Sequence, residues 1–157
     1  MGPLCVGTKA RHARADDDKA EKPEAIAAML DFSAQTRTAM AAGEEVDAVA
    51  ILPEFTKDVK PEMGSFLIEG TGYYKTERGS HPRSTSKVHP LSWDTVVSFE
   101  AFQYNYLIAP RPLLVIAGSR AEPLHMAKRA YAVAKEPKEL FLVDSKTHFD
   151  LYDDAPV

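Results

Sequence analysis

Hydrophobic and polar positions divide the chain into three stretches of different regularity. Residues 23–43 place their larger apolar side chains at helical spacing, begin with Pro23 and end at Gly43. This pattern predicts a long helix with a narrow apolar stripe, lying on a surface. Residues 44–90 are irregular, with Gly, Pro and Ser spread through them, and they predict a long loop-rich excursion.

Two apolar runs in the third stretch predict the core of the fold. LLVIAG (113–118) is rich in β-branched and other apolar residues, and ELFLVDS (139–145) is a second such run. Residues 123–137 between them have helical spacing. A strand–helix–strand segment of this length predicts a right-handed parallel unit, whose strands are typically buried on both faces. Ahead of it, Ser92 can cap a helix over residues 93–102.

Composition excludes several classes of protein. The chain has 157 residues, 45% of them hydrophobic, which suits one α/β domain with a sizeable core. A net charge of −4 argues against binding to nucleic acid, and no apolar run approaches the length that spans a membrane. Cys5 is the one cysteine, and His81, His89 and His125 lack zinc-site spacing, so we expect no metal and no cofactor. A cytoplasmic protein is the expected setting.

Candidate chemistry follows the two predicted strands. Ligands of parallel sheets bind beyond the carboxyl ends of the strands, where Glu122 follows the first strand and His148 follows the second. A carboxylate that orients an imidazole, and an imidazole that takes a proton from a nucleophile, form two thirds of a catalytic triad. Asp144 is the second candidate acid. The alternative is that His148 and Glu122 are ordinary loop residues.

Three segments carry a resemblance to a known family: RPLLVIAGSRAEP, AYAVAKEPKELFLVD and THFDLYD. Together they resemble the C-terminal half of the α/β-hydrolase superfamily, in its bacterial branch similar to dienelactone hydrolases and X-Pro-peptidase-like esterases. The resemblance implies ester or related acyl-bond hydrolysis, with His148 as the triad base. It also implies a triad acid in the loop that follows LLVIAG. The family usually has Asp at this place, where this chain has Glu122.

The dense run of charges near the N-terminus predicts that residues 1–22 form a charged, poorly ordered segment. The resemblance implies a partial α/β-hydrolase fold for the rest, with a mainly helical, cap-like region over 23–104 and the C-terminal part of the core over 105–157. Tyr73, Tyr74 and Trp93 either line a pocket under the cap or pack the cap on the core.

The family nucleophile, in a G-x-S-x-G or G-x-C-x-G turn, has no match in this sequence. Ser65, Ser80 and Ser119 miss the pattern, and Cys5 in PLCVG comes nearest without a preceding strand. We therefore expect a truncated chain that is inactive alone and acts on a small ester-like substrate if completed by an N-terminal half. The alternative is a non-catalytic binding module derived from a hydrolase, with self-association through an exposed sheet edge.

Overall fold

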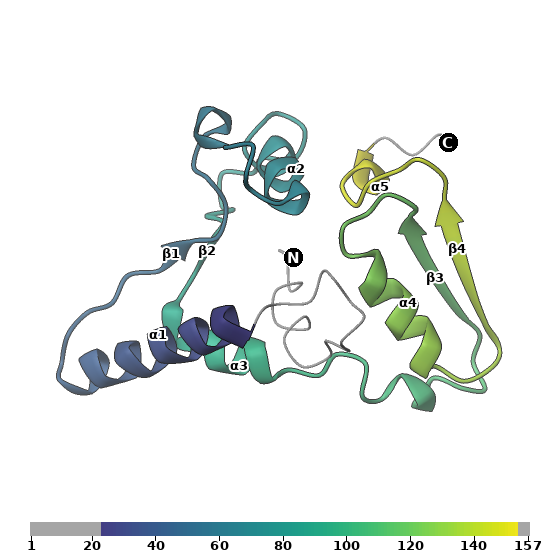
Figure 1. Cartoon of the computed structure of the whole chain (residues 1–157), viewed down its shortest axis with the longest axis horizontal. Coiled ribbons are helices and arrows are strands. Elements are labelled where there is room, and N and C mark those ends of the chain that lie inside the picture. The colour runs from purple at the N-terminus through teal and green to yellow at the C-terminus, as the bar shows by residue number, and fades with distance from the viewer. Residues whose placement is uncertain (1–22, 154–157) are drawn as a thin grey trace. The chain divides into compact units, whose positions relative to one another are not determined.

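The computed structural model of the chain describes residues 23–153 (Figure 1). These residues form two compact units, each built from two separate stretches of sequence. The first unit joins residues 23–51 to 85–101, and the second joins 52–84 to 102–153. Cys5 and the charged segment predicted over 1–22 lie outside the described residues.

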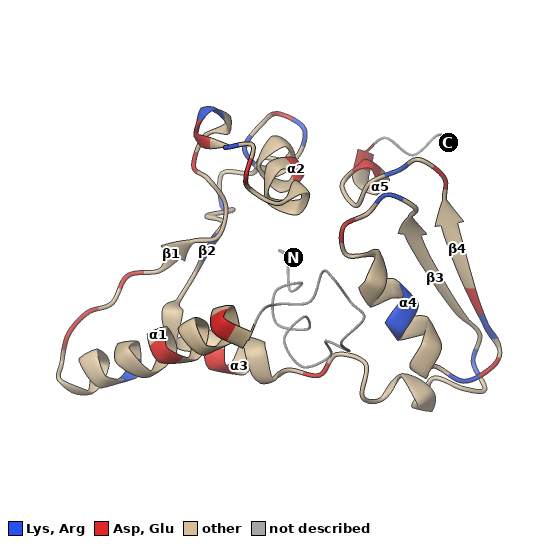
Figure 2. Cartoon of the chain, in the orientation of Figure 1, with Lys and Arg blue, Asp and Glu red and all other residues tan. Residues whose placement is uncertain are grey.

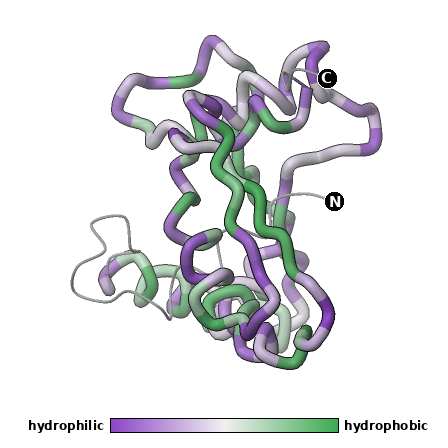
Figure 3. Tube along the Cα trace, turned by 90° about the vertical axis from the view of Figure 1, so that its right-hand side faces the viewer, coloured by the Kyte–Doolittle hydropathy of each residue, from purple (hydrophilic) through white to green (hydrophobic). Residues whose placement is uncertain are grey.

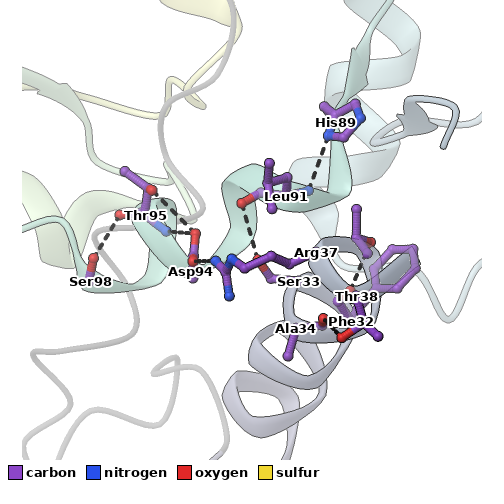
Figure 4. Close-up of polar contacts among 11 residues, drawn as sticks. Phe32, Ser33, Ala34, Arg37, Thr38, His89, Leu91, Asp94, Thr95 and Ser98 are labelled. Atoms are coloured by element: carbon purple, nitrogen blue, oxygen red, sulfur yellow. Dashed lines mark hydrogen bonds and ion pairs between the residues drawn. The ribbon is translucent and has the colours of Figure 1, made fainter. Parts of the chain in front are cut away.

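The first unit is organised by helix α1 (Pro23–Ala41), which packs against α3 (Trp93–Ser98) and the 3-10 turn Pro90–Ser92. The predicted helix is confirmed, and it ends before Gly43, whose φ of +87° is a left-handed conformation that favours glycine. Small polar residues make the contact: fully buried Ser33 donates to the carbonyl of Leu91 at 3.1 Å (Figure 4). Arg37 pairs with Asp94 at the rim of the same contact.

A short antiparallel ribbon completes the first unit. Strands β1 (Val49–Ala50) and β2 (Lys87–Val88) pair with Val49 opposite Val88. The helix predicted over 93–102 is shorter than expected, because Phe99 adopts an extended backbone and ends α3.

The second unit contains the predicted parallel unit. Strands β3 (Leu113–Gly118) and β4 (Lys138–Val143) pair in parallel from Leu113 opposite Lys138 to Gly118 opposite Val143. Helix α4 (Leu124–Val133) forms the crossover and packs on one face of the two strands (Figure 1). A mixed α/β architecture with a small parallel sheet is therefore confirmed.

The prediction that these strands are buried on both faces is wrong. The side chains of Leu114, Ile116 and Phe141, on the face away from α4, are 55%, 55% and 52% exposed. Figure 2 shows both strands without charge over most of their length, and in Figure 3 they are two adjacent hydrophobic stretches. A run of apolar residues shows that both faces of a strand could be buried. The second face is buried only if another layer of the protein covers it. We call Leu114, Ile116 and Phe141 the open sheet face.

Helix α2 (Ser65–Tyr74), in a segment expected to be irregular, is the element that the sequence did not reveal. It packs on the chain after β4 through aromatic rings, centred on Phe149, whose side chain is 2% exposed. The rings of Phe66, Tyr73 and Tyr74 lie with their centroids 5.3, 5.9 and 5.9 Å from that of Phe149. Gly70 permits this approach, since a Cβ there would lie 3.1 Å from the Phe149 ring. The C-terminal helix α5 (Asp150–Asp153) follows at once.

Candidate functional site

The loops that follow β3 and β4 are joined backbone to backbone. The N–H of Ser119 donates to the carbonyl of Val143, and the N–H of Arg120 donates to that of Lys146, both at 2.9 Å. Gly118 makes the approach possible, because a Cβ at this position would lie 2.2 Å from the Lys146 carbonyl oxygen. The expectation that both loops emerge at one edge of a parallel sheet is confirmed.

His148 lies in the second of these loops and is half-buried among aromatic rings. Its ring centroid is 5.7 Å from that of Phe66 and 5.1 Å from that of Phe149. Burial lowers the pKa of the His148 imidazole below its ordinary value, so the ring is neutral at neutral pH. A neutral imidazole has a free lone pair and can accept a proton.

The hydrogen bond that the structure gives to the His148 ring joins Nε2 to the hydroxyl of Tyr152, at 2.9 Å. Tyr152 lies four residues further along, on α5, and its ring centroid is 5.3 Å from that of His148. The sequence reasoning missed Tyr152, although the spacing in THFDLYD is the i, i+4 spacing of neighbours on a helix.

Reciprocal hydrogen bonds fix the backbone on both sides of His148. The N–H of Thr147 donates to the Asp150 carboxylate at 2.8 Å, and the N–H of Asp150 approaches the Thr147 hydroxyl at 3.4 Å. This arrangement resembles a capping box at the start of α5. The Thr147 N–H also holds the pKa of Asp150 below its usual range.

Arg78 fixes the other end of α5. Its guanidinium donates to both carboxylate oxygens of Asp153, at 2.8 and 2.6 Å, and lies over the Tyr73 ring at 5.5 Å. The Arg78 hydrogen bond lowers the pKa of Asp153. A bidentate pair of this kind is more directional than a single contact, so it restrains the helix that carries Tyr152.

Glu122, the candidate acid, binds the first turn of α2. Its Oε2 accepts hydrogen bonds from the Ser65 hydroxyl at 3.1 Å and from the Phe66 N–H at 2.6 Å. Phe66 thus touches both candidate residues, because its N–H binds Glu122 and its ring lies against His148. Glu122 and His148 therefore lie against the same helix, α2. Within the described residues, 23–153, no hydrogen bond joins the two side chains to each other.

Glu69, on α2, adds a second carboxylate to this region. Burial raises the pKa of Glu69, with smaller contributions from a Thr147 hydrogen bond that opposes the shift and from the negative charges of Asp150 and Glu122 that add to it. Glu69 was not among the residues that the sequence suggested.

The remaining candidates have structural contacts. Ser119 donates to Asp144, the second candidate acid, at 3.4 Å and accepts the N–H of Ser145 at 2.9 Å. His81 and His89 accept backbone N–H groups through Nδ1, and His125 contacts the carbonyl of Glu122. Tyr73 and Tyr74 pack on Phe149, and Trp93 belongs to the first unit.

Residues 23–153 contain no group of three or more His, Cys, Asp or Glu side chains arranged to bind a metal ion. Nor is any of their helices both long and apolar enough to cross a bilayer.

Fold and site together define a mixed α/β protein whose parallel strand–helix–strand unit presents a half-buried imidazole at the carboxyl edge of its strands.

No protein-family model matches the chain. It is similar to PA2218, an uncharacterized protein of Pseudomonas aeruginosa, at 36% identity over 127 residues that cover 76% of this chain and 34% of PA2218. It is also similar to YcjY, an uncharacterized protein of Escherichia coli K12, at 22% identity over 79% of this chain and 40% of YcjY.

The similarity to PA2218 extends to its fold. The crystal structure of PA2218 matches 94% of this chain with a TM-score of 0.76 and 29% identity, and the match covers 45% of the PA2218 chain. This chain therefore spans less than half the length of the relatives that it matches.

Proposed function

We propose that this chain carries the acid–base part of an ester-hydrolysing site of the α/β-hydrolase type, with His148 as the proton acceptor. The observation that carries the proposal is the half-buried imidazole at the carboxyl edge of a parallel strand–helix–strand unit. Support also comes from the restraints on its loop, since the backbone hydrogen bond from Arg120 to Lys146 and the Thr147–Asp150 pair hold it on both sides.

In this proposal, His148 takes the proton from a nucleophile as that group attacks an acyl carbon, and returns it to the leaving group. Glu122 is the acid of the proposal, and it orients the imidazole once it leaves the first turn of α2. The nucleophile turn has no match in the sequence, so we propose that a segment such as the longer relatives contain supplies it. The substrate is a small ester or related acyl compound.

A chimera tests the role of His148. The part of PA2218 that matches this chain is replaced by residues 23–157 of the chain, and hydrolysis of p-nitrophenyl acetate is measured. We expect turnover to fall by about 10³-fold or more in the His148→Ala chimera, as for loss of a triad base. His81→Ala, an exposed histidine outside the site, is the matched control and keeps its activity. Equal rates in both variants would refute the proposal.

The 157-residue chain alone gives the complementary result. We expect p-nitrophenyl acetate turnover no faster than buffer, because base and acid without a nucleophile do not form an acyl intermediate. Turnover above buffer that is lost in Ser65→Ala or Cys5→Ala would identify a nucleophile within the chain and overturn the proposal of a missing one. Ser65 is included because its hydroxyl already donates to Glu122.

A second candidate is an interaction module, which the open sheet face favours. Three large apolar side chains more than half exposed on a parallel sheet form a surface of the kind that normally lies under a covering layer. In this candidate, a second copy of the chain covers the face. Light scattering after size exclusion tests it: Ile116→Lys shifts a dimer to monomer, whereas Phe55→Lys, at 56% exposure outside the sheet, does not. A monomer at every concentration refutes it.

A further inference from the structure

We infer that Tyr152 is a positioning residue for His148: its hydroxyl donates to Nε2 and so keeps the imidazole proton on Nδ1. The inference deepens the proposed function and rests on it for its catalytic meaning. It starts from the 2.9 Å separation between the Tyr152 hydroxyl and the Nε2 atom.

The position of the Tyr152 ring is well restrained. Its centroid lies 5.2 Å from that of Tyr73 and 5.6 Å from that of Phe149, in edge-to-face arrangements that aromatic pairs favour. Arg78 holds the next residue, Asp153, through two hydrogen bonds. Ring packing on one side and an anchored neighbour on the other direct the hydroxyl toward the imidazole.

The chemistry of the two groups favours one direction of the hydrogen bond, because a phenol hydroxyl is a stronger donor than an imidazole N–H and an imidazole nitrogen is a stronger acceptor than a phenol oxygen. A phenol keeps its proton at neutral pH and is a strong donor, and burial keeps the His148 imidazole neutral. A neutral imidazole has one N–H and one lone pair. If the phenol donates to Nε2, the lone pair is on Nε2 and the proton is on Nδ1. This is the form that a histidine base requires.

The same contact has a consequence for ligands. Tyr152 occupies on Nε2 the place that the hydroxyl of a nucleophile or substrate would take, so such a group must replace Tyr152 as donor. Nε2 therefore accepts a hydrogen bond from a hydroxyl group, and in this structure the hydroxyl of Tyr152 is that donor.

The experiment is a long-range proton–nitrogen NMR spectrum of the ¹⁵N-labelled 157-residue chain, recorded above the titration of His148. We expect an unprotonated Nε2 and a protonated Nδ1. In Tyr152→Phe, which keeps the ring and loses the hydroxyl, we expect the population protonated at Nε2 to grow, because free imidazole side chains favour that form. Tyr73→Phe removes a hydroxyl from the same aromatic cluster and leaves the His148 signals unchanged.

A protonated Nε2 in the unaltered chain would overturn the inference, and so would a Tyr152→Phe spectrum identical to the original. The first result needs no variant, so it decides even if Tyr152→Phe does not fold. The proposed function is tested separately by the PA2218 chimera. It fails if the chimera hydrolyses the ester equally well with and without His148.

Discussion

The Glu122 carboxylate accepts the backbone N–H of Phe66 at 2.6 Å, across 56 positions of sequence. Gly64, the residue that precedes α2, has no side chain with which to cap the helix. The first N–H groups of a helix have no partner within the helix and attract negative charge. Glu122 therefore supplies, from the loop after β3, the cap that the local sequence lacks.

Removal of this cap should destabilise the second unit. We expect Glu122→Ala to lower the free energy of unfolding by about 1 kcal/mol, the usual effect of losing a helix cap. Urea denaturation followed by circular dichroism measures it. Glu122→Gln keeps an acceptor oxygen and should lose less, and Glu139→Ala, on the exposed side of β4, should have little effect. An unchanged midpoint for Glu122→Ala would contradict the assigned role.

Gly118 gives a second test, because a side chain there meets backbone rather than a movable side chain. A Cβ would lie 2.2 Å from the carbonyl oxygen of Lys146 and 2.6 Å from that of Thr147. We expect Gly118→Ala to destabilise the unit by about 3 kcal/mol, at the upper end for overpacking. Gly72→Ala is the matched control: its Cβ would meet nothing within 4 Å. Within α2 it should stabilise by roughly 0.5 kcal/mol. Thermal unfolding distinguishes the two.

The lowered pKa of His148 predicts a loss of stability in weak acid. Between the ordinary pKa of 6.5 and the lower folded value, the unfolded chain binds more protons at this residue than the folded chain. Stability therefore rises with pH in this window and falls as pH drops through it. Urea denaturation at about pH 7.5 and about pH 5.5 should show a smaller difference for His148→Gln than for the unaltered chain. A pH difference in His148→Gln as large as that of the unaltered chain would contradict the prediction.

Glu69 predicts the opposite dependence. Because burial raises its pKa above 4.5, the folded chain holds the Glu69 proton more tightly than the unfolded chain, and stability from this residue falls as pH rises through that window. We expect Glu69→Gln to raise the melting temperature at neutral pH and to change it little near about pH 4. Glu62→Gln, at an exposed position before α2, serves as control. A lower melting temperature for Glu69→Gln at neutral pH would show that its Thr147 hydrogen bond outweighs the burial.

The sequence predicted those parts of the fold that depend on neighbouring residues. LLVIAG is a continuous apolar run bounded by Pro112 and Gly118, and it forms β3 with the predicted bounds. Pro23 and Gly43 likewise mark where α1 begins and where the helical conformation stops. The position of His148 at the carboxyl edge followed from the parallel order of β3 and β4 alone.

Features that depend on distant residues were not predictable in the same way. The glycines of SFLIEGTGYY favour a loop when read locally, yet Gly70 is a packing site for Phe149, 79 positions away. The cap from Glu122 to Phe66 and the pair of Arg78 with Asp153 join equally remote positions. The hydrophobic pattern also overestimated the burial of β3, because the types of its side chains do not reveal whether another layer of the protein covers the second face of the sheet.

The contrast between β3–β4 and α2–α5 has a consequence for the order in which the second unit assembles. The partners in the parallel unit are 25 residues apart in the chain, whereas Arg78 and Asp153 are 75 apart. Closing the longer loop costs more chain entropy before any contact compensates it. We therefore expect β3, α4 and β4 to form early, and the surroundings of His148 to acquire their final arrangement only when α2 docks. Pulsed hydrogen exchange during refolding should accordingly protect Val115 amides before those of Leu67.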